Sequence, residues 1–501
     1  MSVRVLDTRL RGALVGTRLP FRFGIVEMTE LVHVVLFATV EVDGVREVGV
    51  AADNLAPKWF TKDPDTSYRE DAAEMVAVIE DACAAAVACG PCPTVFDLWH
   101  AAYRAAVVES ETARPPLLSG FGVSLIERVT IDAFCRVKGL PFAQAVRRNE
   151  LGVRLEALHP ELAGRAPSEL LPARPSTRIR VRHTVGLADT LVESELAADP
   201  DDGLPATLEA CIRRYGLRRF KVKIGADSKA NLDRLERIGS VLTRETGGSF
   251  RVTLDGNEQL ADVEELRELW ESLVADRRTA ALAGRIDYVE QPLPRHLALG
   301  GDTAAGLAAW PGRPRLLIDE SDDALDSVAR ALTAGYDGGA FKSSKGVFKG
   351  IGNACRLEQL RRERPGRTFL YSAEDLSTIG PVGLPADLAA IATLGIDEPE
   401  RNGYHYLRGL SGLPARVEAE TVRRHPDLFT HHPDGRAVLR IAGGQIALDS
   451  VAAAPFGVGW RCDFEDDLPG AASVVAALRS GTTGRRNQVE NGTRRRLRDD
   501  G

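Results

Sequence analysis

Phe220-Lys-Val-Lys223 decides the fold, because it is the first of five short segments in which an ionisable side chain ends an apolar run. The four later segments are Leu254-Asp-Gly-Asn257, Val289-Glu-Gln-Pro292, Ile318-Asp-Glu320 and Gly339-Ala-Phe-Lys342. The ionisable groups stand at positions 223, 255, 290, 319 and 342, at intervals of 32, 35, 29 and 23 residues. One strand and one helix of a (β/α)₈ barrel together take about 30 residues. The spacing therefore predicts such a barrel, with one ionisable group at the carboxyl end of each successive strand.

The composition excludes several classes of protein. The 501 residues are 44% hydrophobic and 27% charged, with a formal net charge of −7, which is typical of a globular protein and gives no basic face for nucleic acid. No apolar run reaches the roughly 18 residues of a membrane helix, and arginines interrupt the first 16 residues, which argues against a secretory signal. Seven cysteines do not suggest a disulfide framework. We expect a cytoplasmic protein without nucleic-acid or membrane partners.

The pattern of strands and helices divides the chain into five predicted segments. Residues 1–140 indicate an N-terminal α+β domain, with a strand over 31–42 and helices over 69–89 and 120–139. Residues 141–178 are rich in Arg, Leu and Pro and indicate a helical insertion. Alternating strands and helices over 179–414 predict the barrel. Residues 415–466 contain short strands that we expect to rejoin the first domain, and 467–501 is expected to be a disordered tail.

Three carboxylates are predicted to converge at one end of the barrel. Residues two apart on a strand share a face, so Lys221 and Lys223 point the same way, while Asp255, Glu290 and Asp319 end the next three strands. Without compensation these carboxylates would repel one another and raise each other's pKa values. A hard divalent cation with oxygen ligands removes this conflict, which suggests Mg²⁺, with Mn²⁺ as an alternative. These motifs contain no Cys or His, which argues against zinc there.

Two lysines are expected on opposite sides of this metal site. Lys223 ends the second strand and Lys342 the sixth, and these strands lie opposite each other in a closed barrel of eight. A substrate chelated by the metal would then have one amine on each face. The arrangement suits removal of a proton next to a carboxylate, with the metal stabilising an enediolate and a lysine acting as base.

The motifs as a set resemble those of the enolase superfamily, in its muconate-lactonising subgroup (the mandelate racemase/muconate-lactonising enzyme family). The pattern is Lys-x-Lys, Asp-x-Asn, Glu-Gln-Pro, Asp-Glu and a late barrel lysine, and it covers about residues 180–400. The resemblance implies a (β/α)₇β barrel with an α+β capping domain built from the N-terminal domain and the C-terminal segment. It also implies dependence on Mg²⁺, a Lys base, a small carboxylate substrate and a homo-oligomer.

The resemblance also implies roles for individual residues. Lys223 and Lys342 correspond to the acid/base lysines, with Lys221 as an electrostatic helper. Asp255, Glu290 and Asp319 correspond to the metal ligands, supported by Asn257 and Glu320. Glu374 follows a later strand, where family members often keep a polar substrate contact. His183, at the end of the first strand, has no counterpart that can be transferred; we expect a ligand-binding side chain or a satisfied histidine at a strand end.

Two loops of the first domain correspond in order to the family's specificity loops. They cover residues 18–29 and 54–64, and Lys58, Trp59 and Lys62 of the second loop could meet an anionic or bulky substrate. The alternative is that these three are ordinary exposed loop residues.

Several reactions remain open from the sequence. Two lysines on opposite faces favour racemisation or epimerisation, whereas syn-dehydration or cycloisomerisation could use the same core with one lysine holding charge. A Schiff-base aldolase using Lys223 or Lys342 is an alternative that leaves the three carboxylates unexplained. A barrel that binds a metabolite without turnover is the non-enzymatic alternative.

Overall fold

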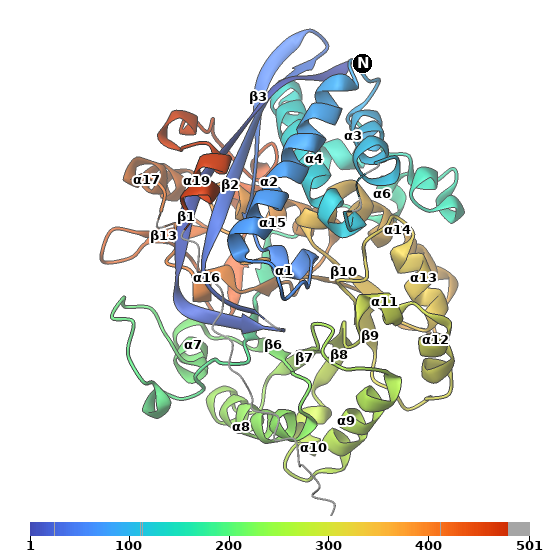
Figure 1. The fold of residues 1–501 in the computed structure, drawn as a ribbon, viewed down its shortest axis with the longest axis vertical. Helices are drawn as coiled ribbons and strands as arrows, with labels where there is room; N and C mark the ends of the chain where they lie inside the picture. The colour runs from blue at the N-terminus through green and yellow to red at the C-terminus, as the bar shows by residue number, and fades with distance from the viewer. Residues whose placement is uncertain (25, 111, 113, 411, 479–501) are drawn as a thin grey trace, which may run out of the picture.

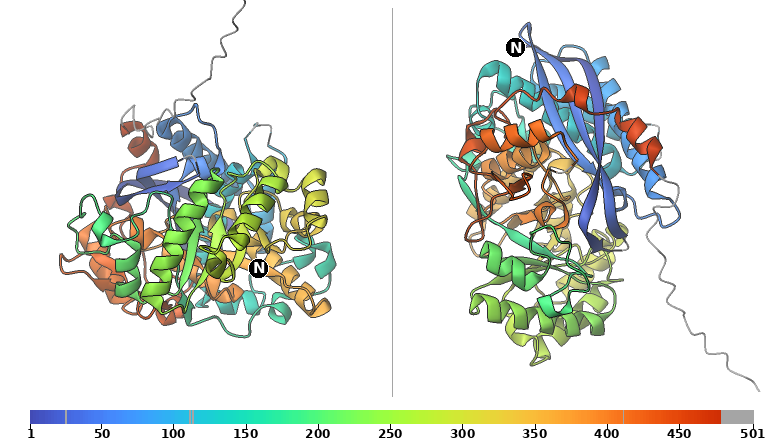
Figure 2. Two further views of the ribbon diagram at one scale, coloured as in Figure 1. Left: turned by 90° about the horizontal axis from the view of Figure 1, so that it is seen from below. Right: turned by 90° about the vertical axis from the view of Figure 1, so that its left-hand side faces the viewer.

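The computed structural model describes residues 1–24, 26–110, 112, 114–410 and 412–478. Its N-terminal domain, here called the cap, begins with a three-stranded antiparallel sheet in the order β1-β2-β3. The strands are β1 (Val3–Phe23), β2 (Val26–Val42) and β3 (Val45–Leu55). Asp43 and Gly44 both have positive φ, which makes the tight turn between β2 and β3. The sheet runs along one side of the molecule, and β1 and β2 extend toward the barrel (Figures 1 and 2).

Helices cover one face of the cap sheet. They are α2 (Tyr68–Ala88), α3 (Val95–Tyr103) and α4 (Pro116–Lys138). Ser67 and Glu70 form a reciprocal capping box that fixes the start of α2. A Cβ atom on Gly49 of β3 would collide with the carbonyl of Val129, so the glycine permits close packing of α4 on the sheet. The two helices predicted for this domain are confirmed as α2 and α4.

Eight parallel strands form the second domain, a nearly closed barrel. In chain order they are β5 (Arg182–Val185), β6 (Arg219–Lys223), β7 (Arg251–Asp255), β8 (Ile286–Glu290), β9 (Leu316–Ile318), β10 (Gly338–Phe341), β11 (Leu370–Ala373) and β12 (Glu400–Arg401). The sheet order β11-β10-β9-β8-β7-β6-β5-β12 matches the order along the chain, apart from β12, which pairs with β5. The predicted barrel with a separate α+β domain is therefore confirmed.

Helices after the strands surround the barrel, as Figure 1 shows for the strands β6 to β9. The principal ones are α7 (Leu208–Tyr215), α8 (Ser228–Thr246), α9 (Val263–Ala275), α12 (Gly301–Ala308), α13 (Ser327–Ala334), α14 (Val347–Glu363) and α15 (Gly383–Leu394). α8 and α9 each have a mainly apolar buried side and begin at a side-chain cap, Asp227 and Asp262 respectively. No helix in the described part of the chain is both long and apolar enough to cross a membrane.

Side chains bridge the seam between β11 and β12, the two edge strands of the barrel sheet. Arg182 of β5 donates from Nη2 to the Ser372 hydroxyl (2.7 Å) and to the Ala373 carbonyl (3.1 Å) of β11. Oδ2 of Asp375 accepts a hydrogen bond from the backbone amide of Asn402, 2.9 Å away. The barrel is thus completed by buried polar contacts where backbone pairing stops.

The insertion between cap and barrel is helical, as expected. It contains the short helices α5 (Phe142–Arg147) and α6 (Pro167–Leu170) and two 3₁₀ turns. α5 packs against α15 and α6 against α14, so the insertion covers one part of the barrel's outer surface.

The C-terminal segment departs from the prediction that residues 415–466 complete the cap. β13 (Phe429–His431) and β14 (Ala437–Leu439) pair with each other, and β15 (Gln445–Ala447) pairs with β4 (Arg178–Arg180), directly before the barrel. These strands form two-stranded pairs and do not join the cap sheet. The later part returns to the cap, where the centre of the Phe464 ring lies 5.8 Å from that of Phe37 and Glu465 accepts a hydrogen bond from Arg9 at 2.6 Å.

The predicted disordered tail is wrong for its first part. α19 (Ala471–Ala477) packs against β1 and α2, with Ala471 and Val475 buried. The helix approaches β1 closely because Gly12 has no side chain and Ala471 has a small one. Residues 479–501, which carry the rest of that prediction, lie outside the described residues.

Candidate active site

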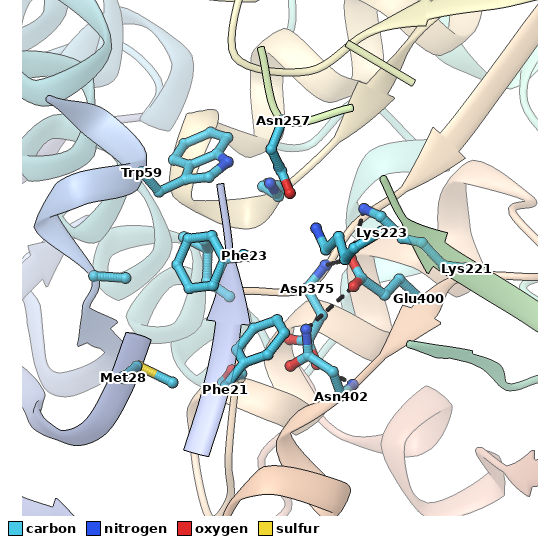
Figure 3. Close-up of a pocket in the computed structure, with 14 residues that line it drawn as sticks. Phe21, Phe23, Met28, Trp59, Lys221, Lys223, Asn257, Asp375, Glu400 and Asn402 are labelled. Atoms are coloured by element: carbon cyan, nitrogen blue, oxygen red, sulfur yellow. Dashed lines mark hydrogen bonds and ion pairs between the residues drawn. The ribbon is translucent and has the colours of Figure 1, made fainter. Parts of the chain in front are cut away.

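A small cavity lies between the carboxyl ends of the barrel strands and the cap (Figure 3). The barrel side contributes mainly charged and polar side chains: Lys221, Lys223, Asn257, Lys342, Asp375, Glu400 and Asn402. The cap side contributes apolar ones: Phe21, Phe23, Met28 and Trp59. The cavity therefore has a polar floor and an apolar wall, and the two come from different domains.

Lys221 is held by four carboxylates. Its ammonium nitrogen lies 2.8 Å from Asp255, 3.0 Å from Glu290, 2.6 Å from Glu374 and 3.1 Å from Glu400. Burial alone would lower the pKa of Lys221, but these carboxylates raise it well above its ordinary value. Lys221 is therefore a fixed positive charge, in keeping with the electrostatic role expected for it.

Lys223 and Lys342 both line the cavity, at the ends of the second and sixth barrel strands. Lys223 contacts Asp255 at 2.6 Å and lies 5.9 Å from the centre of the Phe23 ring. Lys342 contacts Asp319 at 2.5 Å and lies 3.8 Å from the centre of the Trp59 ring. Lys223 and Lys342 therefore each have one carboxylate partner and one aromatic neighbour from the cap.

The expected rise in carboxylate pKa values is found for only one of the three predicted metal ligands. Burial and the neighbouring carboxylates of Asp255 and Glu374 raise the pKa of Glu290 well above its usual range. Burial would also raise the pKa of Asp255, but Lys221 and Lys223 outweigh it and lower that pKa. Lys342 and Lys345 likewise overcome burial and lower the pKa of Asp319. Ammonium groups thus neutralise part of the predicted repulsion.

The acidic side of the site has donors suited to a hard divalent cation. Asp255 and Glu290 lie opposite each other on the neighbouring strands β7 and β8. Oε2 of Glu290, Oε2 of Glu320 and Oδ1 of Asn257 are buried and have no hydrogen-bond partner. Carboxylate and amide oxygens are ligands that Mg²⁺ and Mn²⁺ accept. These residues therefore fit the cation that the sequence predicts.

The described residues contain a second set of potential metal ligands elsewhere, and lysines engage Asp319 of the predicted set. Among the described residues, the one group of three His, Cys, Asp or Glu whose ligand atoms all lie within 4.8 Å of one another is His183, Cys211 and His405. Asp319 is instead engaged by two lysines, since Oδ2 contacts Lys342 and Oδ1 lies 3.0 Å from Lys345. A cation shared by all three carboxylates would require Asp319 to exchange at least one lysine contact for the metal.

Asn257 and Glu320 lie next to the carboxylates and connect them to the cap. Nδ2 of Asn257 donates to Oε1 of Glu320 at 3.0 Å, and its backbone amide donates to Asp255 at 2.9 Å. Lys62 of the cap donates to the Asn257 carbonyl at 2.7 Å and contacts Glu258 at 2.5 Å. Asn257 has a positive φ of 40°, which aims this turn at the cap.

The sequence predicts one shared role for Lys58, Trp59 and Lys62 of the second cap loop, whereas the structure places the three side chains differently. Trp59 lines the cavity and Lys62 contacts the barrel turn. Lys58 turns away, since it contacts Asp71 at 2.6 Å and Thr66 within the cap. The contact between loop and barrel is therefore made by Trp59 and Lys62 alone of these three.

His183 was expected to be either a ligand-binding side chain or a satisfied histidine at a strand end, and it lies away from the cavity. Its neighbours on the strand, Arg182 and Thr184, point into the barrel and contact Thr253 and Glu400. Because side chains alternate along a strand, His183 points outward. It is buried beside Tyr404 and does not line the cavity, and burial lowers its pKa to about 3. Glu374 does lie in the barrel interior, between Lys221 and Arg182.

Sequence reasoning missed several residues of the site. Glu400 and Asn402 line the cavity. They were missed because β12 has only two residues and no apolar run from which a strand could be predicted. Lys345, three residues after Lys342, contacts Asp319 and Asp322 and gave a weak signal as a second lysine in Phe341-Lys-Ser-Ser-Lys345. Phe21 and Phe23 also line the cavity; they lie at the end of β1, within residues 18–29, which the sequence predicts as a loop.

Comparison with known proteins gives matches at the level of three-dimensional structure only. No family model matches the sequence, and no curated protein matches it. Among solved structures, the chain is similar to a muconate lactonizing enzyme from Mycobacterium smegmatis complexed with muconolactone. The identity is 19%, the match covers 92% of this chain and 98% of that one, and the TM-score is 0.55.

Two further solved structures extend the comparison. A dipeptide epimerase from Cytophaga hutchinsonii, complexed with Mg and the dipeptide D-Ala-L-Val, is 14% identical over 93% of this chain and 98% of that chain (TM-score 0.55). An N-succinyl Arg/Lys racemase from Bacillus cereus is 13% identical over 89% and 97% (TM-score 0.54). The chain thus has the fold of the mandelate racemase/muconate lactonizing enzyme-like proteins of the enolase superfamily. The resemblance predicted from the motifs is confirmed for that fold.

Proposed function

We propose that this chain is an enolase-superfamily enzyme that depends on Mg²⁺ and removes the α-proton of a carboxylate substrate to give an enediolate. The observation that carries the proposal is the pair Lys223 and Lys342, which line one cavity beside buried carboxylates. Asp255, Glu290 and Asp319 are the residues that would hold Mg²⁺. When bound, the ion would supply positive charge to the oxygens of the enediolate.

Racemisation or epimerisation is the reaction that best suits two cavity lysines. One lysine, as the free amine, takes the α-proton from one face of the substrate. The other, as the ammonium, delivers a proton to the same carbon from the opposite face. The first lysine ends as an ammonium and the second as an amine, so no external reagent is consumed. Solved structures of the same fold include epimerases and a racemase, which supports this choice.

The apolar wall of the cavity suggests the kind of substrate. Phe21, Phe23, Met28 and Trp59 all face the space above the lysines. An apolar substituent on the substrate would remove this surface from water, which stabilises binding by about 25 cal/mol per Å² of apolar area. We therefore expect carboxylates with an apolar or aromatic group, such as N-acylated or dipeptide forms of apolar amino acids.

Exchange of hydrogen for deuterium tests the proposal. Carboxylates of four classes (N-acyl amino acids, dipeptides, hydroxy acids and sugar acids) are incubated with the protein and Mg²⁺ in D₂O, and the α-position is followed by NMR. We expect exchange in at least one class, its loss with EDTA, and its loss in Lys223→Ala. Absence of exchange in all four classes would contradict the proposal.

The same experiment separates the alternative reactions. Inversion at an α-carbon that gains one deuterium indicates a racemase or epimerase, whereas loss of water or ring opening indicates a dehydratase or a cycloisomerase. A Schiff-base aldolase would be trapped on Lys223 or Lys342 by borohydride and would keep its activity in EDTA. Binding of a ligand without exchange or turnover would indicate a metabolite-binding barrel.

A further inference from the structure

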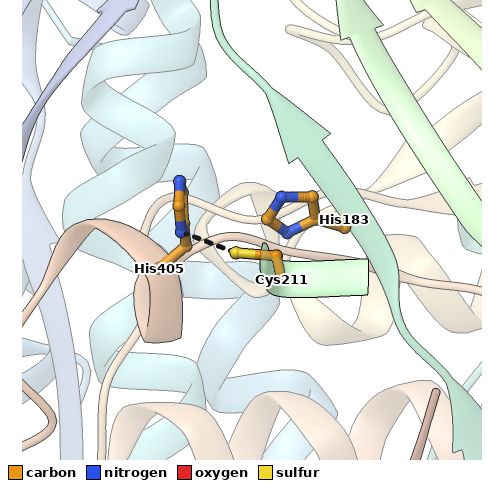
Figure 4. A group of neighbouring side chains, drawn as sticks. All are labelled: His183, Cys211 and His405. Atoms are coloured by element: carbon orange, nitrogen blue, oxygen red, sulfur yellow. Dashed lines mark hydrogen bonds between the residues drawn. The ribbon is translucent and has the colours of Figure 1, made fainter. Parts of the chain in front are cut away.

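A second cluster of potential metal ligands lies outside the cavity (Figure 4). It consists of His183 on β5, Cys211 on α7 and His405 on α16 (Gly403–Tyr406), and is called the His-Cys cluster below. All three side chains are buried, with exposed fractions of 1%, 0% and 3%. The cluster lies behind the first barrel strand, and none of its members lines the cavity.

The separation of Cys211 and His405 fits two ligands of a tetrahedral metal ion. Sγ of Cys211 lies 3.5 Å from Nδ1 of His405, and one ligand atom from each of the three residues lies within 4.8 Å of the others. Zinc binds thiolate sulfur at about 2.3 Å and imidazole nitrogen at about 2.0–2.1 Å, which places the two donors about 3.5 Å apart at a tetrahedral angle. The observed separation of sulfur and nitrogen therefore matches that of two ligands of one ion.

Outer partners orient both histidine rings. Nε2 of His405 faces Oδ2 of Asp189 at 3.9 Å, and that carboxylate is held by the Tyr406 hydroxyl and the Gly186 amide, each at 2.7 Å. Nδ1 of His183 lies 2.7 Å from the Tyr404 hydroxyl. Metal-bound histidines usually donate from the other ring nitrogen to a carboxylate, a backbone carbonyl or water, and Asp189 lies on that side of His405. For His405 the nitrogen toward Cys211 and the nitrogen toward Asp189 are different atoms, as that arrangement requires.

We propose that His183, Cys211 and His405 form a binding site for Zn²⁺, distinct from the oxygen-lined cation site of the cavity. Thiolate and imidazole ligands favour zinc, whereas Mg²⁺ prefers oxygen. Two neutral imidazoles and one thiolate leave a bound Zn²⁺ with one excess positive charge, which Asp189 offsets. The neighbouring guanidinium of Arg18 is neutralised by Asp202, at 2.6 Å, so it does not oppose the ion.

The position of the site gives it a role in joining parts of the fold. It links the first barrel strand, the helix that follows it, and α16, which comes directly after the last barrel strand β12. The cap reaches the same place, because Arg18 donates to the His405 carbonyl at 2.9 Å and the Phe21 ring stacks on Tyr406 at 4.0 Å. A zinc ion here would fix the barrel seam and the end of β1 that carries Phe21 over the cavity.

Cobalt substitution tests the site directly. The full chain is freed of metal with a chelator and then given one equivalent of Co²⁺, while a parallel sample given Zn²⁺ is washed and analysed for metal by mass spectrometry. We expect a thiolate-to-cobalt charge-transfer absorption and one retained Zn²⁺ per chain. An ion held by carboxylates alone gives no thiolate absorption, so the cavity site does not interfere with this measurement.

Matched cysteine variants identify the ligand. Cys211→Ser is expected to lose the cobalt–thiolate absorption and the retained zinc, whereas Cys355→Ser, at another buried free cysteine on α14, is expected to keep both. Absence of the thiolate absorption in the wild-type chain would overturn the proposal whether or not Cys211→Ser folds. Retention of that absorption in Cys211→Ser would overturn it as well. Neither result depends on catalysis, so both are independent of the proposed function.

Discussion

The two sides of the cavity floor carry opposite charge balances. On the β6 side, the four carboxylates of Asp255, Glu290, Glu374 and Glu400 surround three cations, Lys221, Lys223 and Arg182. On the β10 side, Asp319 and Asp322 are outnumbered by Lys342, Lys345 and Lys349. The first side therefore has a net negative charge, which suits the proposed metal cation, and the second has a net positive charge, which suits the carboxylate of the proposed substrate.

Each side also contains an inner and an outer lysine. The inner ones, Lys221 and Lys345, are buried and contact several oxygens each. The outer ones, Lys223 and Lys342, have one carboxylate each and an aromatic ring of the cap nearby. A lysine with several counter-charges stays in place, whereas one with a single partner can exchange it for a substrate. Two lysines that are close in the sequence, such as Lys221 and Lys223, are therefore expected to have different roles.

The strongest test of this comparison removes the outer lysines. Lys223→Ala and Lys342→Ala are each expected to lower α-proton exchange by about 10²–10⁴-fold, the usual contribution of a general acid or base. Mg²⁺ affinity, measured by calorimetry, should stay nearly unchanged. Lys229→Ala, at an exposed lysine of α8, is the control. Loss of Mg²⁺ binding in either cavity variant would contradict the assigned roles.

The second largest expected effect is weaker Mg²⁺ binding when a predicted ligand loses its charge. Asp255→Asn and Glu290→Gln remove charge from the acidic side, and each should weaken Mg²⁺ binding by more than the about 10–100-fold caused by losing an outer partner of a metal ligand. Asp233→Asn, on exposed α8, should bind Mg²⁺ as the wild type does. Equal affinity in all three variants would place the cation elsewhere.

Removing an inner lysine should mainly affect stability. Lys221→Met leaves four buried carboxylates without their common counter-charge, and loss of one partner of a buried ion pair typically costs about 3–5 kcal/mol. Mg²⁺ should restore part of this loss, since it would supply positive charge at Asp255 and Glu290. The free energy of unfolding, measured in urea with and without Mg²⁺, checks both points. Lys345→Met is the matched variant, and equal rescue there would remove the distinction between the two sides.

His33 of the cap gives a pH dependence of stability that does not involve the cavity. Burial in the cap lowers the pKa of His33 from its ordinary 6.5 to about 4, although its bond to Asn54 acts in the other direction. The unfolded chain therefore takes up a proton near pH 6.5, and the folded chain only near pH 4. The contribution of His33 to the free energy of unfolding is complete above pH 6.5, and about 3 kcal/mol of it is lost as the pH drops to 4.

The slope of unfolding free energy against pH measures this contribution. His33→Gln cannot titrate, so its slope between pH 6.5 and 4 should be smaller than that of the wild type. An unchanged slope would show that other groups, such as the cavity carboxylates, account for the loss. The comparison thus separates the acid sensitivity of the cap from that of the charged floor.

The smallest expected effect comes from the aromatic wall. Trp59→Leu removes a ring 3.8 Å from the Lys342 ammonium, worth about 1 kcal/mol, and should raise KM about fivefold. Phe23→Leu should change less, because its ring is 5.9 Å from Lys223. A larger effect of Phe23→Leu on KM would indicate that apolar contact with the substrate outweighs the contact between ring and lysine.

The sequence by itself determined the barrel and the face on which its charged residues lie. Repeated intervals between Lys223, Asp255, Glu290, Asp319 and Lys342 encode strand and helix lengths, and alternation along a strand encodes direction. Both are local properties of the chain, so they can be predicted without knowing any long-range contact. The same alternation, applied to Arg182, would have placed His183 on the outside of the barrel.

Only the tertiary structure decided which charges meet. Lys221 contacts residues from β7, β8 and β12 and from the turn after β11, so its environment depends on the order of strands around the barrel and on the closure of the seam. Trp59 and Phe23 reach the lysines from about 200 residues or more away in the sequence, through docking of the cap. Such contacts depend on the packing of whole elements against each other, and no local pattern of residues records that packing.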